Sequence, residues 1–305
     1  MNILITGASG LIGKRLTEML LQQGESVAHL GRGKSKDPRV VSFQWDPAQG
    51  KLDEEAVRWA DAIINLAGAP VADQRWTDKR KKEIIDSRVQ GLRLLADAVK
   101  RNQKPLRTLV SASAIGWYGM VTEDKIFKES DPPSRDFFGE CCSQWEAAAD
   151  LLEETGARVV KLRIGIVLAK EGGALPQLAG PIKAFIGSPL GSGKQWMPWI
   201  HIDDVCEMFL KALRDEKMSG AYNAAGPQPV TNKTFVKTLG KALHRPVFFP
   251  PVPKFILRML LGERAAIVTE GSRVSNEKIV VAGFVYRHSD LLEALRDLYA
   301  INIEN

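Results

Sequence analysis

Three glycines near the start of the chain, Gly7, Gly10 and Gly13, are spaced by three residues within ITGASGLIG at 5–13. They follow the short apolar run 2–6 and precede an amphipathic stretch, so they join a predicted strand to the start of a predicted helix. Free N–H groups and the helix dipole favour an anion there, and glycine lets the backbone approach a pyrophosphate. The spacing therefore predicts a dinucleotide-binding loop; the alternative is a tight turn that holds no ligand.

A second predicted strand, 26–30, ends in Gly31 and Arg32, with Lys34 and Lys36 close behind. Sites for NAD carry an Asp or Glu near this position, which accepts hydrogen bonds from the ribose hydroxyls. A guanidinium instead matches a phosphate group with two parallel hydrogen bonds. The missing acid therefore indicates the 2′-phosphate of NADP, although a solvated basic loop is also consistent with these residues.

The elements that must position this loop alternate along the chain. Further strands are predicted at 62–66, 108–111 and 159–168, and helices at 79–100 and 143–154. Alternating strands and helices predict an α/β fold with a Rossmann-type, doubly wound parallel sheet.

The alternation breaks down in parts of the chain that are rich in Gly and Pro. We therefore expect an NADP-binding Rossmann domain at 1–169 and 200–223, and a smaller, mixed substrate lobe at 170–199 and 224–305. By analogy with two-domain enzymes that bind such nucleotides, the smaller lobe would cover the nicotinamide and select the substrate.

Several motifs carry a resemblance to a known family. TGASGLIG at 6–13, NLAG at 65–68, SASAIGWYG at 111–119 and PWIHIDDV at 198–205 resemble, in order and spacing, the extended short-chain dehydrogenase/reductases. An atypical, epimerase-like branch is similar in KKEIIDSR at 81–88, WEAAA at 145–149 and GSGKQWMPWIHI at 191–202. Residues 250–300 resemble the C-terminal domain of uncharacterised function that marks this branch.

The resemblance implies that the chain binds NADP. The contacts expected for the cofactor are Gly7, Ser9, Gly10, Leu11, Ile12, Gly13, Gly31, Arg32, Leu66, Ala67, Gly68, Glu83, Arg88 and Val167. Arg88 stands where ordinary extended members have an Asn close to the ribose. We expect Arg88 to pair with Glu83 or with a phosphate; an ion pair at the surface, with no ligand, is the alternative.

The proton-transfer pair of this superfamily is missing from the place where we expect it. Members use a Tyr and a Lys four residues later, and the stretch 137–150 aligns with that motif. The alignment puts Glu140 at the Tyr position and Gln144 at the Lys position, which argues against standard Tyr–Lys hydride chemistry. Ser113 corresponds to the substrate-orienting serine, and Tyr118 is a second candidate catalytic residue, as a proton donor.

Aromatic residues gather in the sequence near the predicted cleft. Trp196, Met197 and Trp199 lie close together, and Trp117 follows the strand that carries Ser113. Such residues either wall a cleft for a planar or apolar substrate or fill the seam between the domains.

The remaining polar motifs favour structural roles. No Cys or His cluster has the spacing of metal ligands, and we expect no metal site. His201 is expected to make a structural hydrogen bond, and Asp203 to cap the helix that follows it. Cys141 and Cys142 are expected to be buried rather than reactive.

The composition excludes several classes of protein. The chain has 305 residues and a net charge of +6 that is spread out and mixed with acids, so we expect no nucleic-acid partner. No apolar stretch reaches the length of a membrane span, and three sparse cysteines indicate a reducing compartment, so we expect a cytoplasmic protein. The superfamily's habit suggests a homodimer.

These observations favour an NADP-dependent oxidoreductase that transfers hydride to or from an unidentified small or aromatic carbonyl compound. Ser113, with Tyr118, would orient the carbonyl group. One alternative is a protein that senses NADPH without turning it over and acts through a partner. Another is a nucleotide-sugar epimerase, which is disfavoured because epimerisation also relies on the missing Tyr–Lys pair.

Overall fold

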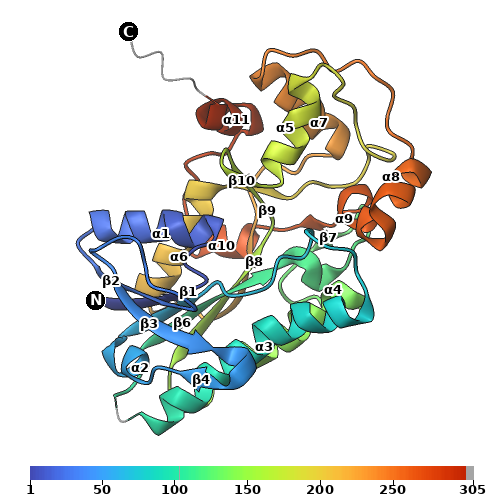
Figure 1. Ribbon diagram of the computed structural model, residues 1–305. Coiled ribbons are helices and arrows are strands. Elements are labelled where there is room, and N and C mark those ends of the chain that lie inside the picture. Colours follow the sequence, from blue (N-terminus) through green and yellow to red (C-terminus); the bar gives the residue numbers. More distant parts are fainter. Residues whose placement is uncertain (103, 300–305) are drawn as a thin grey trace. The chain divides into compact units, whose positions relative to one another are not determined.

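A mostly parallel sheet of eight strands runs through the computed structural model, which describes residues 1–102 and 104–299 (Figure 1). The order is β12-β8-β6-β5-β1-β2-β3-β4, and only β4 is known to pair antiparallel, with β3. The strands are β1 (Asn2–Thr6), β2 (Ser26–Gly31), β3 (Val41–Asp46), β4 (Lys51–Leu52), β5 (Ala62–Asn65), β6 (Thr108–Ala114), β8 (Arg158–Ile164) and β12 (Gly220–Ala224). The predicted Rossmann-type sheet is confirmed.

The central strands are apolar because helices cover both faces of the sheet. Ile3, Leu4 and Ile5 of β1 are fully buried, as are Ile63 and Ile64 of β5. In Figure 1, α3 and α4 lie together on one face, and α1 and α6 on the other. The helices are α1 (Leu11–Gln22), α2 (Glu55–Trp59), α3 (Asp78–Arg101), α4 (Phe137–Asp150) and α6 (Ile202–Arg214).

The chain divides into two compact units. The first consists of Met1–Trp117, Pro133–Arg163 and Cys206–Tyr222, and the second of Tyr118–Pro132, Ile164–Val205 and the chain from Asn223 onward. The predicted Rossmann domain ran without interruption to residue 169, whereas Tyr118–Pro132 belongs to the second unit. This segment supplies β7, whose partner strand β13 comes from the C-terminal part of the chain.

The second unit has its own sheets and its own core. Its strands are β7 (Ile126–Phe127), β9 (Ile166–Ala169), β10 (Gly172–Gly173), β11 (Trp199–His201) and β13 (Arg273–Val274). Its helices are α5 (Leu175–Lys183), α7 (Asn232–Ala242), α8 (Lys254–Leu261), α9 (Ala265–Thr269), α10 (Glu277–Val281) and α11 (Leu291–Tyr299). Trp199, Phe235 and Leu295 are central members of its apolar cluster.

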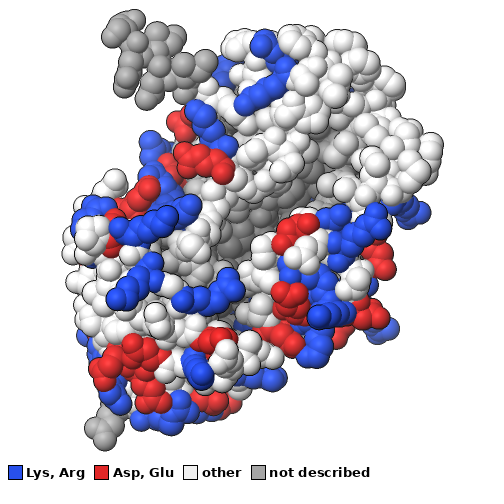
Figure 2. All heavy atoms as spheres, in the orientation of Figure 1, with Lys and Arg blue, Asp and Glu red and all other residues white. Residues whose placement is uncertain are grey.

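Charged side chains are distributed differently over the two units. In the face drawn in Figure 2, basic and acidic residues of the first unit are interspersed, and the region of α8 shows few of either. Phe255, Met259 and Leu260 of α8 are exposed. Among the described residues, no helix is long and apolar enough to cross a membrane.

Candidate functional site

The carboxyl ends of four neighbouring strands collect residues that the sequence assigned to the cofactor or, for Ser113, to catalysis. Gly7 follows β1, Arg32 follows β2, Leu66 follows β5, and Ser113 lies near the end of β6. Because β6, β5, β1 and β2 are adjacent and parallel, these positions line one edge of the sheet in that order. The chain changes winding direction between β5 and β1, which is where nucleotides bind in open α/β sheets.

The three glycines of the β1–α1 loop meet different requirements. Gly7 has a φ of +66°, and a Cβ built there would lie 2.6 Å from the backbone carbon of Leu66. A Cβ on Gly13 would lie 2.6 Å from Ala8 Cα. A Cβ on Gly10 would meet only the Gly7 carbonyl oxygen, at 3.2 Å. Local packing therefore accounts for Gly7 and Gly13 better than for Gly10, which is exposed together with Ser9.

The start of α1 is open to a ligand. Its N-cap residue is Gly10, no side chain caps the first turn, and that turn contains no acid. By contrast, the first N–H groups of α3, α4 and α7 are bound by the side chains of Thr77, Asp136 and Thr231. Leu11 and Ile12 are half-buried, and their backbone forms the helix end at which an anion is favoured.

A buried polar network holds the strand ends together. The Thr6 hydroxyl donates to Asn65 Oδ1 at 2.7 Å, and Asn65 Nδ2 donates to Ser111 Oγ at 3.0 Å. The Thr6 oxygen also accepts from the backbone N–H groups of Leu66 and Ala67, at 3.2 and 3.3 Å. These hydrogen bonds join the ends of β1, β5 and β6 beside the glycine loop. Gly68, in the loop after β5, is exposed.

Arg32 is exposed and has no acidic partner among the described residues. The acid closest to it in sequence, Asp37, is bound by Arg39, whose Nη2 lies 2.6 Å from Asp37 Oδ2. Hydrogen bonds from Arg39 lower the pKa of Asp37 to about 2. The loop after β2 therefore presents a guanidinium and no available carboxylate.

Arg88 and Glu83 do not pair with each other. Glu83 binds Arg80, with Oε1 at 2.8 Å from Nη1, and Arg80 also binds Asp73 at 2.8 Å. Arg88 is partly buried, donates to the carbonyl oxygens of Ala69 and Ile84, and has no acidic partner within the described part of the chain. Burial lowers its pKa. The alternative of a Glu83–Arg88 ion pair is therefore wrong, and the Arg88 charge is available to an anion.

Arg88 packs against the loop after β5. Its guanidinium carbon lies 4.9 Å from the centre of the Trp145 ring, and a Cβ on Gly68 would lie 2.9 Å from that same carbon. The side chain thus lies beside the glycine-lined edge at which β5 ends.

Ser113 contacts a buried ion pair that the sequence did not reveal. Its hydroxyl donates to Glu146 Oε1 at 2.6 Å. Arg163 donates to the same carboxylate, from Nε to Oε1 at 2.8 Å and from Nη2 to Oε2 at 3.0 Å. All three residues are at least 96% buried, since their exposed fractions are 2, 4 and 3%. The Arg163 guanidinium also stacks on Trp117, 3.7 Å from the ring centre.

The helix register expected for the missing Tyr–Lys pair is wrong. Glu140 and Gln144 lie on the exposed face of α4, where Gln144 Nε2 donates to Glu140 Oε1 at 3.2 Å. The residues four apart that face the end of β6 are Cys142 and Glu146. Cys142 is buried, as expected, and burial raises its pKa to about 12, so it remains a thiol.

Tyr118 and Val167 lie in the second unit. The Tyr118 side chain is 2% exposed, stacks on Phe127, and donates from its hydroxyl to Asn223 Oδ1 at 2.7 Å. This geometry favours a structural role for Tyr118 over the proton-donor role considered from the sequence. Val167 is half-buried on β9, where it pairs with Ile200 of β11.

Of the two alternatives for the aromatic residues, a cleft wall is wrong for two of them. Met197 and Trp199 belong to the core of the second unit, and Trp199 Nε1 donates to the Gln228 carbonyl at 3.0 Å. Trp196 is half-buried under Arg273, whose guanidinium lies 4.8 Å from the ring centre.

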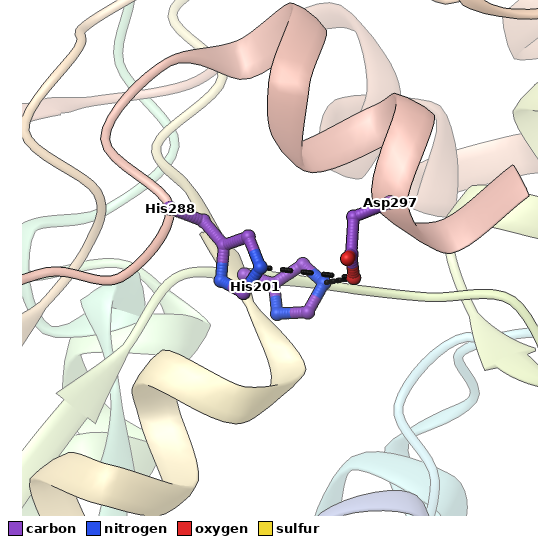
Figure 3. Close-up of side chains that lie close together, drawn as sticks. All are labelled: His201, His288 and Asp297. Atoms are coloured by element: carbon purple, nitrogen blue, oxygen red, sulfur yellow. Dashed lines mark ion pairs between the residues drawn. The ribbon is translucent and has the colours of Figure 1, made fainter. Parts of the chain in front are cut away.

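Two histidines that are distant in sequence stack in the second unit (Figure 3). His201 and His288 have ring centres 3.6 Å apart, and Asp297 Oδ2 lies 3.5 Å from His201 Nε2 and 3.6 Å from His288 Nε2. Their nitrogen and oxygen atoms are close enough to suggest a metal site. However, the Asp203 N–H donates to His201 Nδ1, which places the ring proton on Nε2. A protonated Nε2 and face-to-face rings do not fit a metal ligand set.

The same cluster fixes the start of α6. Because the helix begins at Ile202, Asp203 lies inside its first turn and not at the expected cap. Asp204 is 1% exposed and accepts from the backbone N–H groups of Arg287 and His288. His201 thus has the structural hydrogen bond that was expected of it.

Comparisons with known proteins agree with this arrangement. The model of the NAD dependent epimerase/dehydratase family matches residues 3–225, and a domain of unknown function, DUF1731, matches residues 252–298. An Arabidopsis thaliana protein named "Epimerase family protein SDR39U1 homolog, chloroplastic" is 36% identical, over 97% of this chain and 86% of its own. "Epimerase family protein YfhF" of Bacillus subtilis is 35% identical over 98% of both chains.

A solved structure is similar over the whole fold. The human epimerase family protein SDR39U1 (isoform 2), crystallised with NADPH, has a TM-score of 0.88 and 31% identity. The match covers 98% of this chain and 99% of the human one.

Proposed function

Because the chain belongs to the NAD-dependent epimerase/dehydratase family, we propose that it binds NADPH at the carboxyl edge of its parallel sheet. There it transfers hydride between this nucleotide and a small or aromatic carbonyl compound. The observation that carries the proposal is the edge itself, where an uncapped helix start and an unpaired Arg32 flank the β1–α1 loop. The human relative, solved with NADPH, supports the choice of nucleotide.

The residues at this edge fit the parts of the nucleotide. The start of α1 and the open space at Gly10 suit the pyrophosphate, which needs close approach to N–H groups. Arg32 suits the 2′-phosphate, because it is exposed and the neighbouring Asp37 is already bound to Arg39. Arg88 supplies a second cation, beside Gly68.

A fluorescence titration with NADPH and NADH tests the proposal. We expect NADPH to bind at least about tenfold more tightly than NADH, which corresponds to about 1.4 kcal/mol. Arg32→Ala should remove this preference by weakening NADPH binding alone. Arg93→Ala removes an equally exposed arginine from α3 and should change neither affinity. Equal affinities in the wild type, or a preference that survives Arg32→Ala, would contradict the proposal.

A protein that senses NADPH without oxidising it is the second candidate. The two residues of α4 that face the end of β6, Cys142 and Glu146, are neither Tyr nor Lys, which favours it. The absorbance of NADPH at 340 nm, followed with a panel of aldehydes, ketones and quinones, separates the two. Turnover that Ser113→Ala abolishes at unchanged NADPH affinity supports the oxidoreductase. Tight binding without oxidation by any member of the panel supports the sensor.

A further inference from the structure

The hydrogen bond between Ser113 and Glu146 has a defined direction. Glu146 accepts two hydrogen bonds from Arg163, so it is an ionised carboxylate and offers no proton. The single hydrogen of the Ser113 hydroxyl is therefore donated to Glu146. What Ser113 Oγ still offers to a substrate is a lone pair. While Glu146 is ionised, such an oxygen binds a hydroxyl group, which donates, but not a carbonyl group.

We propose that Ser113 and Glu146 form a proton-transfer pair that replaces the Tyr–Lys pair and acts on a substrate alcohol. This inference rests on the proposed hydride transfer. In the direction of oxidation, the carbon–hydrogen bond of the alcohol breaks and hydride passes to NADP⁺, giving NADPH. The hydroxyl O–H bond breaks as the C=O bond forms, and its proton passes to Ser113 Oγ. The original Ser113 proton passes to Glu146 Oε1, which becomes a carboxylic acid.

The reverse reaction needs the opposite protonation. To reduce an aldehyde or ketone, Glu146 must first take up a proton, which it returns through Ser113 to the alkoxide. Arg163 opposes this uptake because it stabilises the ionised carboxylate. Reduction should therefore become faster as the pH falls and Glu146 takes up this proton. Substrates of the site are accordingly primary or secondary alcohols and the matching carbonyl compounds.

Other groups near Ser113 do not fill this role. Cys142 lies one turn before Glu146 on α4, and its thiol points towards the Ala114 carbonyl oxygen, 3.6 Å away. Glu140 and Gln144 bind each other on the opposite, exposed side of the helix. Glu146 is the only carboxylate among the described residues that accepts a hydrogen bond from Ser113.

A readout that needs no substrate tests the pair. Protein labelled with ¹³C at the glutamate carboxyl carbons is titrated with acid in complex with NADP⁺ and with NADPH, and the Glu146 signal is assigned by its loss in Glu146→Gln. The two nucleotides differ by the positive charge of the nicotinamide. If Glu146 faces the reacting groups, its pKa should be about one unit lower with NADP⁺, as expected for a charge about 10 Å away at an effective dielectric constant of about 20. Glu140, on the exposed face, should titrate identically in both complexes.

Outcomes of this experiment separate the two proposals. Nucleotide saturation is verified by fluorescence in the same samples, so a failure to bind overturns the proposed function and, with it, the pair. If both nucleotides bind to saturation but the pKa of Glu146 is the same in both complexes, the Ser113–Glu146 pair is overturned and the proposed function stands. Because Glu146→Gln leaves Arg163 without its counter-charge, Glu146→Gln/Arg163→Gln is prepared as a second variant that restores neutrality.

Any carbonyl compound that the wild type reduces supplies a second test. The wild-type rate should rise as the pH falls, because reduction needs a protonated Glu146. Glu146→Gln should lose this dependence while its NADPH affinity stays within twofold of the wild type. Glu140→Gln, the matched change on the same helix, should keep the wild-type profile. If the pH dependence of the reduction rate persists in Glu146→Gln, the proposed Ser113–Glu146 pair is overturned.

Discussion

Arg88 and Arg80 lie eight residues apart on α3 but meet different surroundings. Arg80 is 6% exposed and binds both Asp73 and Glu83, so its charge is compensated within the protein. Arg88 is also partly buried, yet the described residues provide it with carbonyl oxygens and no carboxylate. Holding a desolvated charge without a counter-charge costs stability, and this cost is reduced when an anion binds.

Replacement of these two arginines should therefore have opposite effects. Arg88→Met should weaken NADPH binding at least about tenfold and leave the unfolding free energy of the nucleotide-free protein unchanged or higher. Arg80→Met should lower that free energy by about 1–3 kcal/mol, because it leaves the Pro70 carbonyl and two carboxylates without their donor, and should spare NADPH affinity. Fluorescence titration and urea denaturation measure the two quantities. A large loss of stability in Arg88→Met would mean that the charge serves the fold.

Gly7 and Gly10, in the turn between β1 and α1, are glycine for two different physical reasons, which their regular spacing does not reveal. Gly7 must be glycine because of its positive φ and its contact with the Leu66 backbone. Gly10 has an extended backbone, with φ of −75° and ψ of 173°, that any residue adopts. We infer that the demand for glycine at this position comes from a ligand that approaches the start of α1.

Two alanine substitutions separate these demands. Gly7→Ala should lower the free energy of unfolding by more than about 2 kcal/mol, through strain in the left-handed region and overlap with backbone atoms. Gly10→Ala should change stability by less than about 1 kcal/mol and weaken NADPH binding at least about tenfold. Thermal unfolding without nucleotide and a fluorescence titration provide the comparison. If Gly10→Ala binds NADPH as tightly as the wild type, the loop has a structural role only.

The sequence predicted β1, α1 and the cofactor edge because their signals are local. A strand, a glycine turn and a helix follow one another within 22 residues, and parallel pairing then brings the strand ends together. The register of α4 was not predictable in this way. Shifting the assumed pair by two residues turns it by about 200° around a helix, from the exposed to the buried face. The contacts of Glu146 with Ser113 and of Cys142 with Ala114, both distant in sequence, decide between the two faces.

At the scale of the whole molecule, contacts that are distant in sequence define the second unit. His201 and His288 are separated by 87 positions, and β7 pairs with a strand from the other end of the chain. Neither contact leaves a periodic pattern, which is why the histidines looked scattered and 118–132 was assigned to the wrong domain. The same distance explains why a cleft wall remained one of two alternatives for Met197 and Trp199: their partners in the core come from α7 and α11.

The histidine cluster makes the stability of this fold depend on pH. Burial and the neighbouring His288 lower the pKa of His201 from 6.5 to about 4. Asp203, Asp204 and Asp297 face the ring pair and oppose this shift without cancelling it. Above pH 6.5 the imidazole is neutral in both the folded and the unfolded chain. Between pH 6.5 and 4, His201 binds a proton in the unfolded chain but not in the folded chain. The folded state therefore loses stability as the pH falls.

Denaturation by urea at pH 7.5 and 4.5 should reveal this loss. His201 alone should account for a fall of about 2–3 kcal/mol in the free energy of unfolding over this range. His201→Asn removes the titrating group and should show a correspondingly smaller fall, although its stability at pH 7.5 is itself lower. His244→Asn is the matched control, because His244 is exposed and has a φ of 53°, a conformation that asparagine tolerates. If the wild type and His201→Asn lose equal stability with acid, the cluster is not the source of the pH dependence, and carboxylates elsewhere in the chain must carry it.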